Sequence, residues 1–537
     1  MTAKEKRGGS FVVQAAILAS ASLIVRFIGF LYRLPLTELI GDEGNGIYNA
    51  GYQIYTFLLI LSSAGLPAAI SRLVSTRIAK GEYANAHRVF RVAMAFAATL
   101  GSIGMVLLFV FAEQFAAIGG IAESVYSIRT LAPTLLIVSI MSVYRGYLQG
   151  LNIMVPTAVS QIVEQIFNAV FSVYLAWILV KQSLPLGAAG GTAGTGIGAL
   201  AGLVVIIIYY HRERKPILKK IRTETFGLAA ETNRQIFISI VSTAIPIIAG
   251  TAIFSMSNLI DMTMVMSNLG KSGAFTADEA KALYGQLTGK YVTLTTMPVS
   301  ISSAMATAAV PNIAAAVTVG DKRVIKSKIN LALKMAMVIA IPAAVGIGVL
   351  GDNILLMLFP SYPEGGMLLK VGAISIAFLS LCQIVTGVLQ GIGKIYIPVI
   401  GALIGAIVKI ILNSFLIEIP AINVVGAVIS TDACYLAAAV FDLIMLSRIT
   451  GIVPYYGQIL IKPTICSAVM GVSCVVFYKL FDIVFGNTIS TLVTIVLAMG
   501  VYLVCMLLIK GITEKDFQSI PKGRSMVRIF KKLKLMR

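Results

Sequence analysis

Stretches of about twenty mostly apolar residues recur along almost the whole chain, and they constrain the fold more than any other feature. A helix needs roughly 20 such residues to cross about 30 Å of hydrocarbon. Only 12% of the residues are charged, about half the share of a typical soluble domain. The pattern therefore predicts an all-α polytopic membrane protein. It excludes a cytosolic enzyme, a secreted disulfide scaffold and a disordered chain.

The apolar stretches predict fourteen transmembrane helices. Their approximate bounds are 11–33, 47–71, 89–112, 125–148, 156–179, 187–210, 235–261, 284–311, 329–350, 366–390, 396–418, 422–447, 461–481 and 488–509. The first stretch is too long for the apolar part of a signal peptide and no small-residue cleavage site follows it, so we expect it to remain as a span.

The basic residues predict the orientation of these spans. With the amino terminus placed in the cytoplasm, the inside segments contain 31 Lys and Arg residues and the outside segments contain seven. Cytoplasmic loops of membrane proteins carry such an excess. We therefore expect both termini to be cytoplasmic in a bacterial plasma membrane. The net charge of +20 is explained by this topology, and no nucleic-acid partner is expected.

A weak internal repeat, with a shift of about 240 residues, predicts the domain organisation. Gly146-Tyr-Leu-Gln-Gly150 recurs as Gly387-Val-Leu-Gln-Gly391, and Ser62-Ser-Ala recurs as Ser302-Ser-Ala. Six spans separate the copies, so both enter the membrane from the same side, as in two-lobed transporters. We expect two parallel six-helix lobes and two further helices. The expected parts are lobe 1–210, basic linker 211–234, lobe 235–447, helices 448–509 and basic tail 510–537.

Ionisable residues inside the predicted spans are the candidates for function, because each costs roughly 2.5–3.5 kcal/mol on insertion scales. Arg26 and Arg33 lie two turns apart in the first span, and we expect Arg26 to line a cavity. Glu164 and Lys409 occupy equivalent places in the two repeats, and either pair as a gate or bridge between the lobes or contact substrate. Asp261 is a further candidate in the seventh span.

Other polar residues have simpler interpretations. Asp432 and Asp442 are expected to link helices through hydrogen bonds, and both histidines fall in basic loops. The five cysteines lie in apolar stretches without metal-ligand spacing. No catalytic or nucleotide-binding pattern is present. We expect neither enzymatic activity nor a metal or cofactor, apart from a coupling ion such as Na⁺ or H⁺.

Several segments make the chain resemble a known family, the polysaccharide-transporter type of the MOP flippase superfamily. The resemblance is strongest to the group of stage V sporulation protein B and MurJ-type lipid II flippases. It covers nearly the whole chain. The segments are Arg26-Phe-Ile-Gly-Phe-Leu-Tyr-Arg33, Gly41-Asp-Glu-Gly-Asn-Gly-Ile-Tyr48, Gly65-Leu-Pro-Ala-Ala-Ile-Ser-Arg72, the run from Pro156 to Glu164, Leu283-Tyr-Gly285, Leu389-Gln-Gly-Ile-Gly-Lys394 and Asn423-Val-Val-Gly-Ala427.

This resemblance implies a V-shaped fold. It also implies that the protein moves an undecaprenyl-diphosphate-linked sugar, with lipid II as the leading candidate, to the outer leaflet by alternating access. Arg26 and Arg33 match the arginines that line the family's cationic cavity. Asn49 stands near a position where the family has an acidic residue. Arg72 lies nearer the cytoplasmic end than the family's second-span arginine. The implied partners are a lipid-linked oligosaccharide, the bilayer and the cell-wall synthesis machinery, with the protein itself a monomer.

Three other functions remain open at this stage. One is a multidrug or cation antiporter of the same superfamily, which would favour acidic residues where this chain has first-span arginines. Another is a flippase for a different lipid-linked oligosaccharide or a sporulation-specific wall precursor. The third is a structural partner of the division or sporulation machinery, for which the intramembrane charges would be dispensable.

Overall fold

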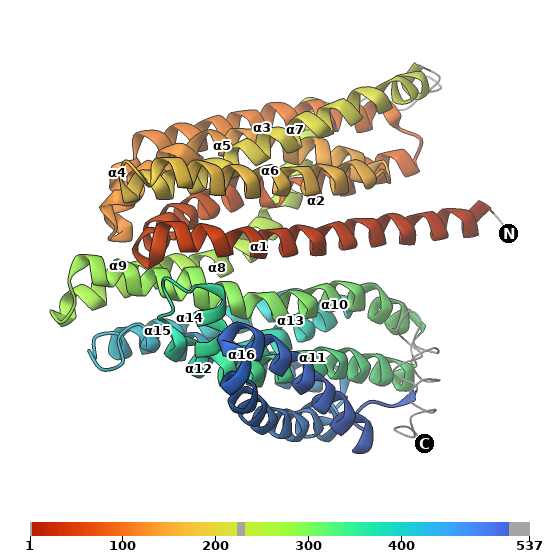
Figure 1. Ribbon diagram of the computed structural model, residues 1–537. Coiled ribbons are helices and arrows are strands. Elements are labelled where there is room, and N and C mark those ends of the chain that lie inside the picture. The colour runs from red at the N-terminus through yellow and green to blue at the C-terminus, as the bar shows by residue number, and fades with distance from the viewer. Residues whose placement is uncertain (1–2, 223–230, 320, 515–537) are drawn as a thin grey trace. The chain divides into compact units, whose positions relative to one another are not determined.

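The computed structural model describes residues 3–222, 231–319 and 321–514. These residues form helices and connections without any strand. They divide into two compact units, residues 1–285 and 286–537, and each unit is described here by itself (Figure 1).

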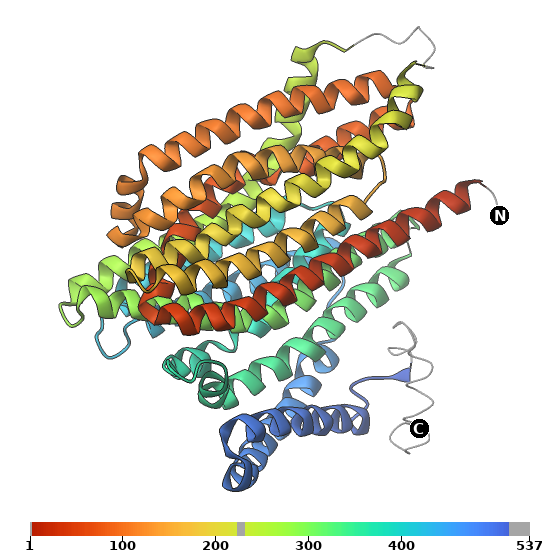
Figure 2. The ribbon, with the colours of Figure 1, turned by 45° about the horizontal axis from the view of Figure 1, so that its top comes forward.

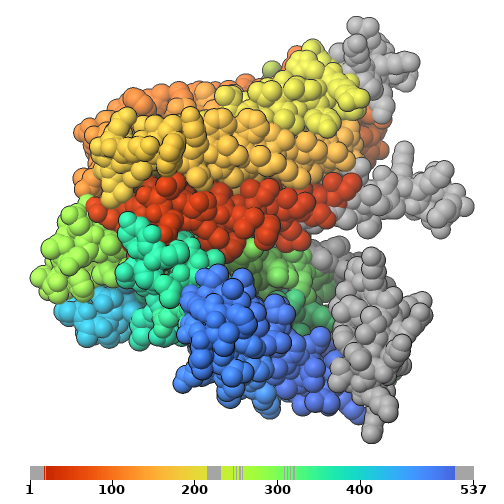
Figure 3. Space-filling model, in the orientation of Figure 1, coloured from red at the N-terminus to blue at the C-terminus, as the bar shows by residue number. Residues whose placement is uncertain are grey.

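Unit 1 is a bundle of long helices (Figures 1 and 2). One face has α1 lying along α6 (Figure 3). Its elements are α1 (Ala3–Leu59), the π-helix η1 (Ile60–Ala64), α2 (Leu66–Ala79), α3 (Tyr83–Val110), α4 (Ala112–Gly119), the 3₁₀ turn η2 (Ala122–Ser124), α5 (Val125–Gly150), α6 (Val155–Leu179), α7 (Leu184–Arg222), α8 (Asn233–Ser272) and α9 (Ala277–Gly285).

Helix α1 is broken at Gly41, where the backbone adopts φ 65° and ψ −173°. Glycine tolerates a positive φ because it has no Cβ. The side chains of Asn45 and Asn49 donate hydrogen bonds to the carbonyls of Gly41 and Asn45, at 2.8 and 2.9 Å. These bonds satisfy buried backbone oxygens beside the break, as apolar surroundings require. The residues from Ala3 to Leu59 therefore form two helical segments joined by a kink at Gly41.

Unit 2 is a second helical bundle. Its elements are the π-helix η3 (Gln286–Tyr291), α10 (Val292–Val319), α11 (Lys322–Leu358), α12 (Gly366–Gly372), α13 (Ser375–Gly391), α14 (Tyr396–Leu416), α15 (Val425–Thr450), the π-helix η4 (Gly457–Ile461) and α16 (Lys462–Leu508). Helix α16 has a break at Gly486 (φ 70°, ψ 171°) like that of α1.

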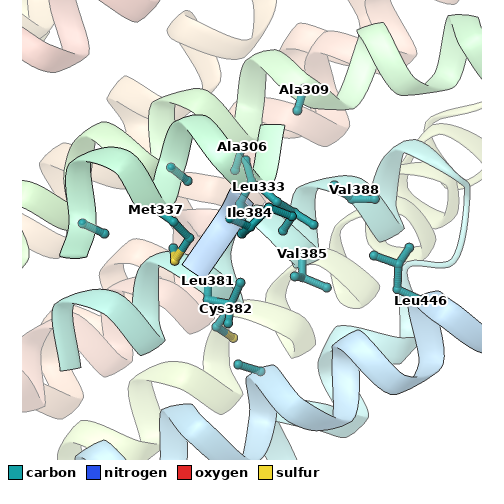
Figure 4. Packing of buried hydrophobic residues seen from close by; sticks show 14 of the residues in the cluster. Ala306, Ala309, Leu333, Met337, Leu381, Cys382, Ile384, Val385, Val388 and Leu446 are labelled. Carbon is teal, nitrogen blue, oxygen red and sulfur yellow. The ribbon is translucent and has the colours of Figure 1, made fainter. Parts of the chain in front are cut away.

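The core of unit 2 is formed where α10, α11, α13 and α15 meet (Figure 4). Leu333 and Met337 from α11 lie beside Ile384 from α13, and all three are almost fully buried. Burial of an aliphatic side chain stabilises a fold by about 1.5–3 kcal/mol relative to water. Within a bilayer that gain is smaller, and close contact between helices carries more of the stability.

The same helix–helix contact occurs in both units at the residues of the predicted repeat. In unit 1, Gly146 and Gly150 of α5 face α2. A Cβ on Gly146 would lie 2.8 Å from the Pro67 carbonyl oxygen, and a Cβ on Gly150 would lie 2.7 Å from the Val74 Cβ. In unit 2, Gly387 and Gly391 of α13 face α10. A Cβ on Gly387 would lie 2.8 Å from the Ala306 carbonyl oxygen, and a Cβ on Gly391 would lie 2.9 Å from that of Val310. Small residues permit such close approach of helices in lipid. This recurrence supports the repeat.

Nine helices of the described ranges are long and apolar enough to cross a bilayer, or ten if the bent pair α12 and α13 is one span. The count of fourteen therefore stays a prediction, and so do the lobe boundaries. Helix α8, which the repeat assigns to the second lobe, packs within unit 1.

Candidate functional site

The break in α1 brings Arg33 beside tyrosines that follow it by four turns or more. The Arg33 guanidinium donates a hydrogen bond to the Tyr32 hydroxyl and lies close to the phenols of Tyr48 and Tyr52. In a straight helix, fifteen residues would separate Arg33 from Tyr48 by about 22 Å. The two tyrosine rings stack, with centroids 5.9 Å apart and planes at 10°. Arg33 itself is half-buried.

A second charged pair lies between α5 and α6. Arg145 Nη2 donates to Glu164 Oε2 at 2.7 Å and to Ser160 Oγ at the same distance. The Arg145 side chain is 13% exposed and that of Glu164 is 27% exposed. Glu164 also lies near the hydroxyls of Tyr52 and Tyr55. The pair is thus joined electrostatically to the tyrosines beside Arg33.

We call these five residues the unit 1 polar cluster: Arg33, Tyr48, Tyr52, Arg145 and Glu164. The cluster has two guanidinium groups and one carboxylate, and Arg26 adds an exposed cation seven residues before Arg33 on α1. Guanidinium N–H groups and phenolic O–H groups are hydrogen-bond donors suited to phosphate oxygens. The arrangement can therefore bind an anionic group.

Each of the other candidate residues has surroundings of its own. The amide of Asn49 is buried and bonded to the backbone of its own helix. Arg72 is exposed on α2. Asp261 of α8 is half-buried and lies near the Tyr284 phenol of α9. Lys409 is 4% exposed in α14 of unit 2.

The acidic residues of α15 do not form the links expected of them. Both carboxylate oxygens of Asp442 are buried and have no hydrogen-bond partner among the described residues, and the same is true of Oδ1 of Asp432. Asp442 is packed against α14, where a Cβ on Gly401 would lie 2.5 Å from its Oδ1. The expected interhelical hydrogen bonds are therefore absent from this described region.

Arg145, Tyr48 and Tyr52 are members of the cluster that the sequence reasoning did not select. Arg145 could have been selected as a candidate, because it is an ionisable residue inside the predicted span 125–148. The sequence contains no comparable indication for Tyr48 and Tyr52. Aromatic residues are common in membrane helices, and their approach to Arg33 depends on the break at Gly41.

A separate ion-pair network joins α9 to the rest of unit 1. The ammonium of Lys281 contacts carboxylates of Asp278, Glu123 and Glu43 at 2.7, 2.8 and 3.3 Å. Burial lowers the pKa of Lys281, but these hydrogen bonds outweigh burial and leave the pKa raised. For Glu123, burial raises the pKa and the hydrogen bond from Lys281 outweighs it, so the pKa is lowered. Among the described residues, no cluster of metal-ligating side chains was found.

Comparison with solved structures identifies the fold. The solved structure "Lipid II flippase MurJ, inward closed conformation" matches with a TM-score of 0.68 at 15% identity, over 91% of this chain and 98% of that one. An inward-facing multidrug resistance MATE family transporter of the MOP superfamily matches with a TM-score of 0.67 at 14% identity, over 80% of this chain and 94% of the other. The chain thus has the all-helical MOP transporter fold, which confirms the predicted fold class.

Sequence comparison identifies the family. Residues 11–317 match the family described as "Polysaccharide biosynthesis protein". The chain is 31% identical to the lipid II flippase MurJ of Bacillus subtilis (strain 168), over 85% of this chain and 86% of that protein. It is 26% identical to stage V sporulation protein B of the same bacterium, over 78% and 80%. The chain belongs to this family and is homologous to both proteins. Their names describe a flippase and a sporulation protein, and neither names a catalyst.

Proposed function

We propose that the protein is a flippase that carries an undecaprenyl-diphosphate-linked cell-wall precursor, with lipid II as its cargo, from the inner to the outer leaflet. The observation that carries this proposal is the 31% identity to a lipid II flippase over 85% of the chain. The unit 1 polar cluster is consistent with it, because its arginines outnumber its carboxylates.

The chemistry of the cluster suits such a cargo. A guanidinium can bind two oxygens of one phosphate with parallel hydrogen bonds, which a lysine cannot do. Arg26 is exposed and has no hydrogen bond or ion pair with any described residue, so its charge is available to an anion. Each negative charge moved outward gains about 2.3 kcal/mol per 100 mV of inside-negative potential. Cargo export by alternating access would use this potential, an ion gradient, or both.

A multidrug or cation antiporter is the alternative from a related class, because the fold alone matches MATE transporters equally well. Asp261 favours it, since a half-buried carboxylate in α8 could hold Na⁺ or H⁺. The arginines of the first span oppose it, because they would repel a cationic drug. A coupling ion at Asp261 is compatible with both functions.

We also propose that the protein works as a monomer in the bacterial plasma membrane, alongside the wall-synthesis machinery, with both termini in the cytoplasm. Cysteines introduced at Lys271 and Arg212 test this topology, because both positions are exposed. A membrane-impermeant thiol reagent on intact cells should label the first and spare the second. The reverse pattern would contradict the orientation.

Depletion of the protein in its native cell tests the proposed cargo. Lipid II should accumulate in the inner leaflet while the outer leaflet is depleted, and re-expression should reverse both changes. Accumulation of another lipid-linked glycan would move the proposal to that precursor. Unchanged lipid-linked precursors together with raised drug sensitivity would support the antiporter.

A further inference from the structure

A groove lined by arginines and apolar side chains lies between α3 and α8, whereas the polar cluster belongs to α1, α5 and α6. Helix α8 begins beside α3 (Figure 2). The cavity between them has a volume of about 1040 Å³. Its polar lining residues near the starts of α3 and α8, which we call its mouth, are Arg88, Arg91, Glu231, Thr232, Asn233 and Arg234. The remaining lining residues, which we call its walls, are Val92, Ala95, Phe96, Thr99, Leu100 and Phe237.

The acidic residue at this mouth already has a partner. The Glu231 carboxylate is bound by Arg77 through Nε at 3.1 Å and through Nη2. Arg88 Nη1 donates to the Glu231 carbonyl oxygen at 2.8 Å. Arg91 and Arg234 are exposed and form no hydrogen bond or ion pair with any described residue. Among the described residues, none supplies an anion to these two guanidinium groups of the groove lining.

The apolar walls extend over most of the thickness of one leaflet. Residues 92–100 of α3 rise about 12 Å along the helix, close to half of the roughly 30 Å hydrocarbon core. Two of the lining residues, Phe96 and Phe237, contact each other, with ring centroids 5.3 Å apart and planes at 87°. A ligand that fills this groove needs an anionic head and an apolar tail of that length.

We propose that this groove binds an anionic phospholipid, with its phosphate held between Arg91 and Arg234 and an acyl chain along α3. The positive charges of Arg91 and Arg234 favour an anionic headgroup, and the apolar side chains along about 12 Å of α3 favour contact with an acyl chain. With the predicted topology, the lipid comes from the cytoplasmic leaflet. The site is separate from the cluster proposed to bind cargo, which lies among α1, α5 and α6. It would hold the lipid as a fixed part of unit 1, at the start of α8.

Native mass spectrometry of the purified protein, titrated with phosphatidylglycerol and with phosphatidylcholine, tests this site. We expect tighter binding of phosphatidylglycerol. The double variant Arg91→Gln, Arg234→Gln should weaken it by roughly 10- to 30-fold, since each arginine near an anionic lipid contributes about a factor of five. The matched control Lys322→Gln, Arg323→Gln removes two exposed charges from unit 2 and should leave the affinity within about twofold.

A second variant fills the groove without changing its charge. Ala95 is an exposed wall residue, and Ala95→Trp should also reduce bound phosphatidylglycerol, with thermal unfolding used to confirm that the protein is folded. If the arginine variant is not recovered folded, Ala95→Trp decides alone. Equal affinity for both lipids, an equal loss in the control, or unchanged binding in Ala95→Trp would each overturn the proposal. Displacement of the lipid by glycerol 3-phosphate would show a phosphate site only, and would overturn it too.

Discussion

The helix pair α6–α7 of unit 1 and the pair α14–α15 of unit 2 occupy equivalent places in the predicted repeat, yet they achieve close contact with different residues. In unit 1 the glycines belong to the second helix of the pair. A Cβ on Gly190 of α7 would lie 2.7 Å from the Leu175 carbonyl oxygen. In unit 2 they belong to both helices: a Cβ on Gly405 of α14 would lie 2.7 Å from the Cys434 carbonyl oxygen, and a Cβ on Gly426 of α15 would lie 2.8 Å from the Leu416 carbonyl carbon.

The polar groups of the two pairs differ further. Glu164 of α6 is neutralised by Arg145, whereas its counterpart in α14 is Lys409 and the buried Asp442 of α15 has no hydrogen-bond partner among the described residues. In both pairs glycines bring the two helix backbones close together, whereas the charged groups of the two pairs differ. The two helix pairs thus share close glycine contacts but differ in how their buried charges are compensated, and the following predictions test that difference.

Loss of Arg145 should have the largest effect on folding. Arg145→Met leaves the Glu164 carboxylate in a largely buried place without its cation, and removal of one partner of such a pair costs about 3–5 kcal/mol. We expect low yield and a lower unfolding temperature in detergent. The double variant Arg145→Met, Glu164→Gln removes both charges and should recover most of the loss. Equal instability of the single and double variants would contradict the pairing.

Filling the α6–α7 contact should have the next largest effect. In Gly198→Ala the new methyl would meet the Glu164 carbonyl oxygen and the Asn168 side chain, and overpacking of this kind costs about 1–3 kcal/mol. Gly500→Ala in α16 is the matched control, because nothing lies within 4 Å of its Cβ position. That change should be neutral or slightly stabilising. Thermal unfolding of both variants measures the difference, and equal values would show that this close contact is unimportant.

Substitution of Asp442 should change the unfolding temperature in the opposite direction from substitution of Arg145. Asp442 forms no ion pair with a described residue, so Asp442→Asn removes a buried carboxylate that no described residue compensates, at nearly constant volume. We expect unchanged or higher unfolding temperature, since an unpaired buried acid is costly. A strong loss of stability would reveal a partner for Asp442 outside the described residues.

The Lys281 network should give the smallest effect, and one that depends on pH. The lowered pKa of Glu123 means that its stabilisation is present above the usual glutamate pKa and is lost as the pH falls through the lower folded value. The raised pKa of Lys281 places its own loss at alkaline pH. Between these limits, Lys281→Met should lower the unfolding temperature by a nearly constant amount. The gap from the parent protein should narrow in acid, and a gap that widens there would contradict the network.

The sequence was informative where the physics is local and failed where it depends on distant contacts. The length of the apolar stretches and the repeated Gly146 and Gly387 motifs predicted a helical membrane fold with two related halves. Arg26 and Arg33 could be selected because charges are rare in such spans. The partner of Glu164 could not, since Arg145 lies nineteen residues away on another helix. The tyrosines beside Arg33 depend on one glycine with a positive φ at position 41.

The central claim is that the first-span arginines bind an anionic cargo, and Arg26→Ala tests it most directly. Arg26 is exposed and forms no ion pair with a described residue, so its loss should leave the protein folded and inserted. In a flippase-depleted bacterium, Arg26→Ala should abolish lipid II appearance in the outer leaflet at normal protein level. Arg26→Lys should restore it in part, because an ammonium keeps the charge but loses the planar fork. Full export by Arg26→Ala at normal protein level would contradict the account.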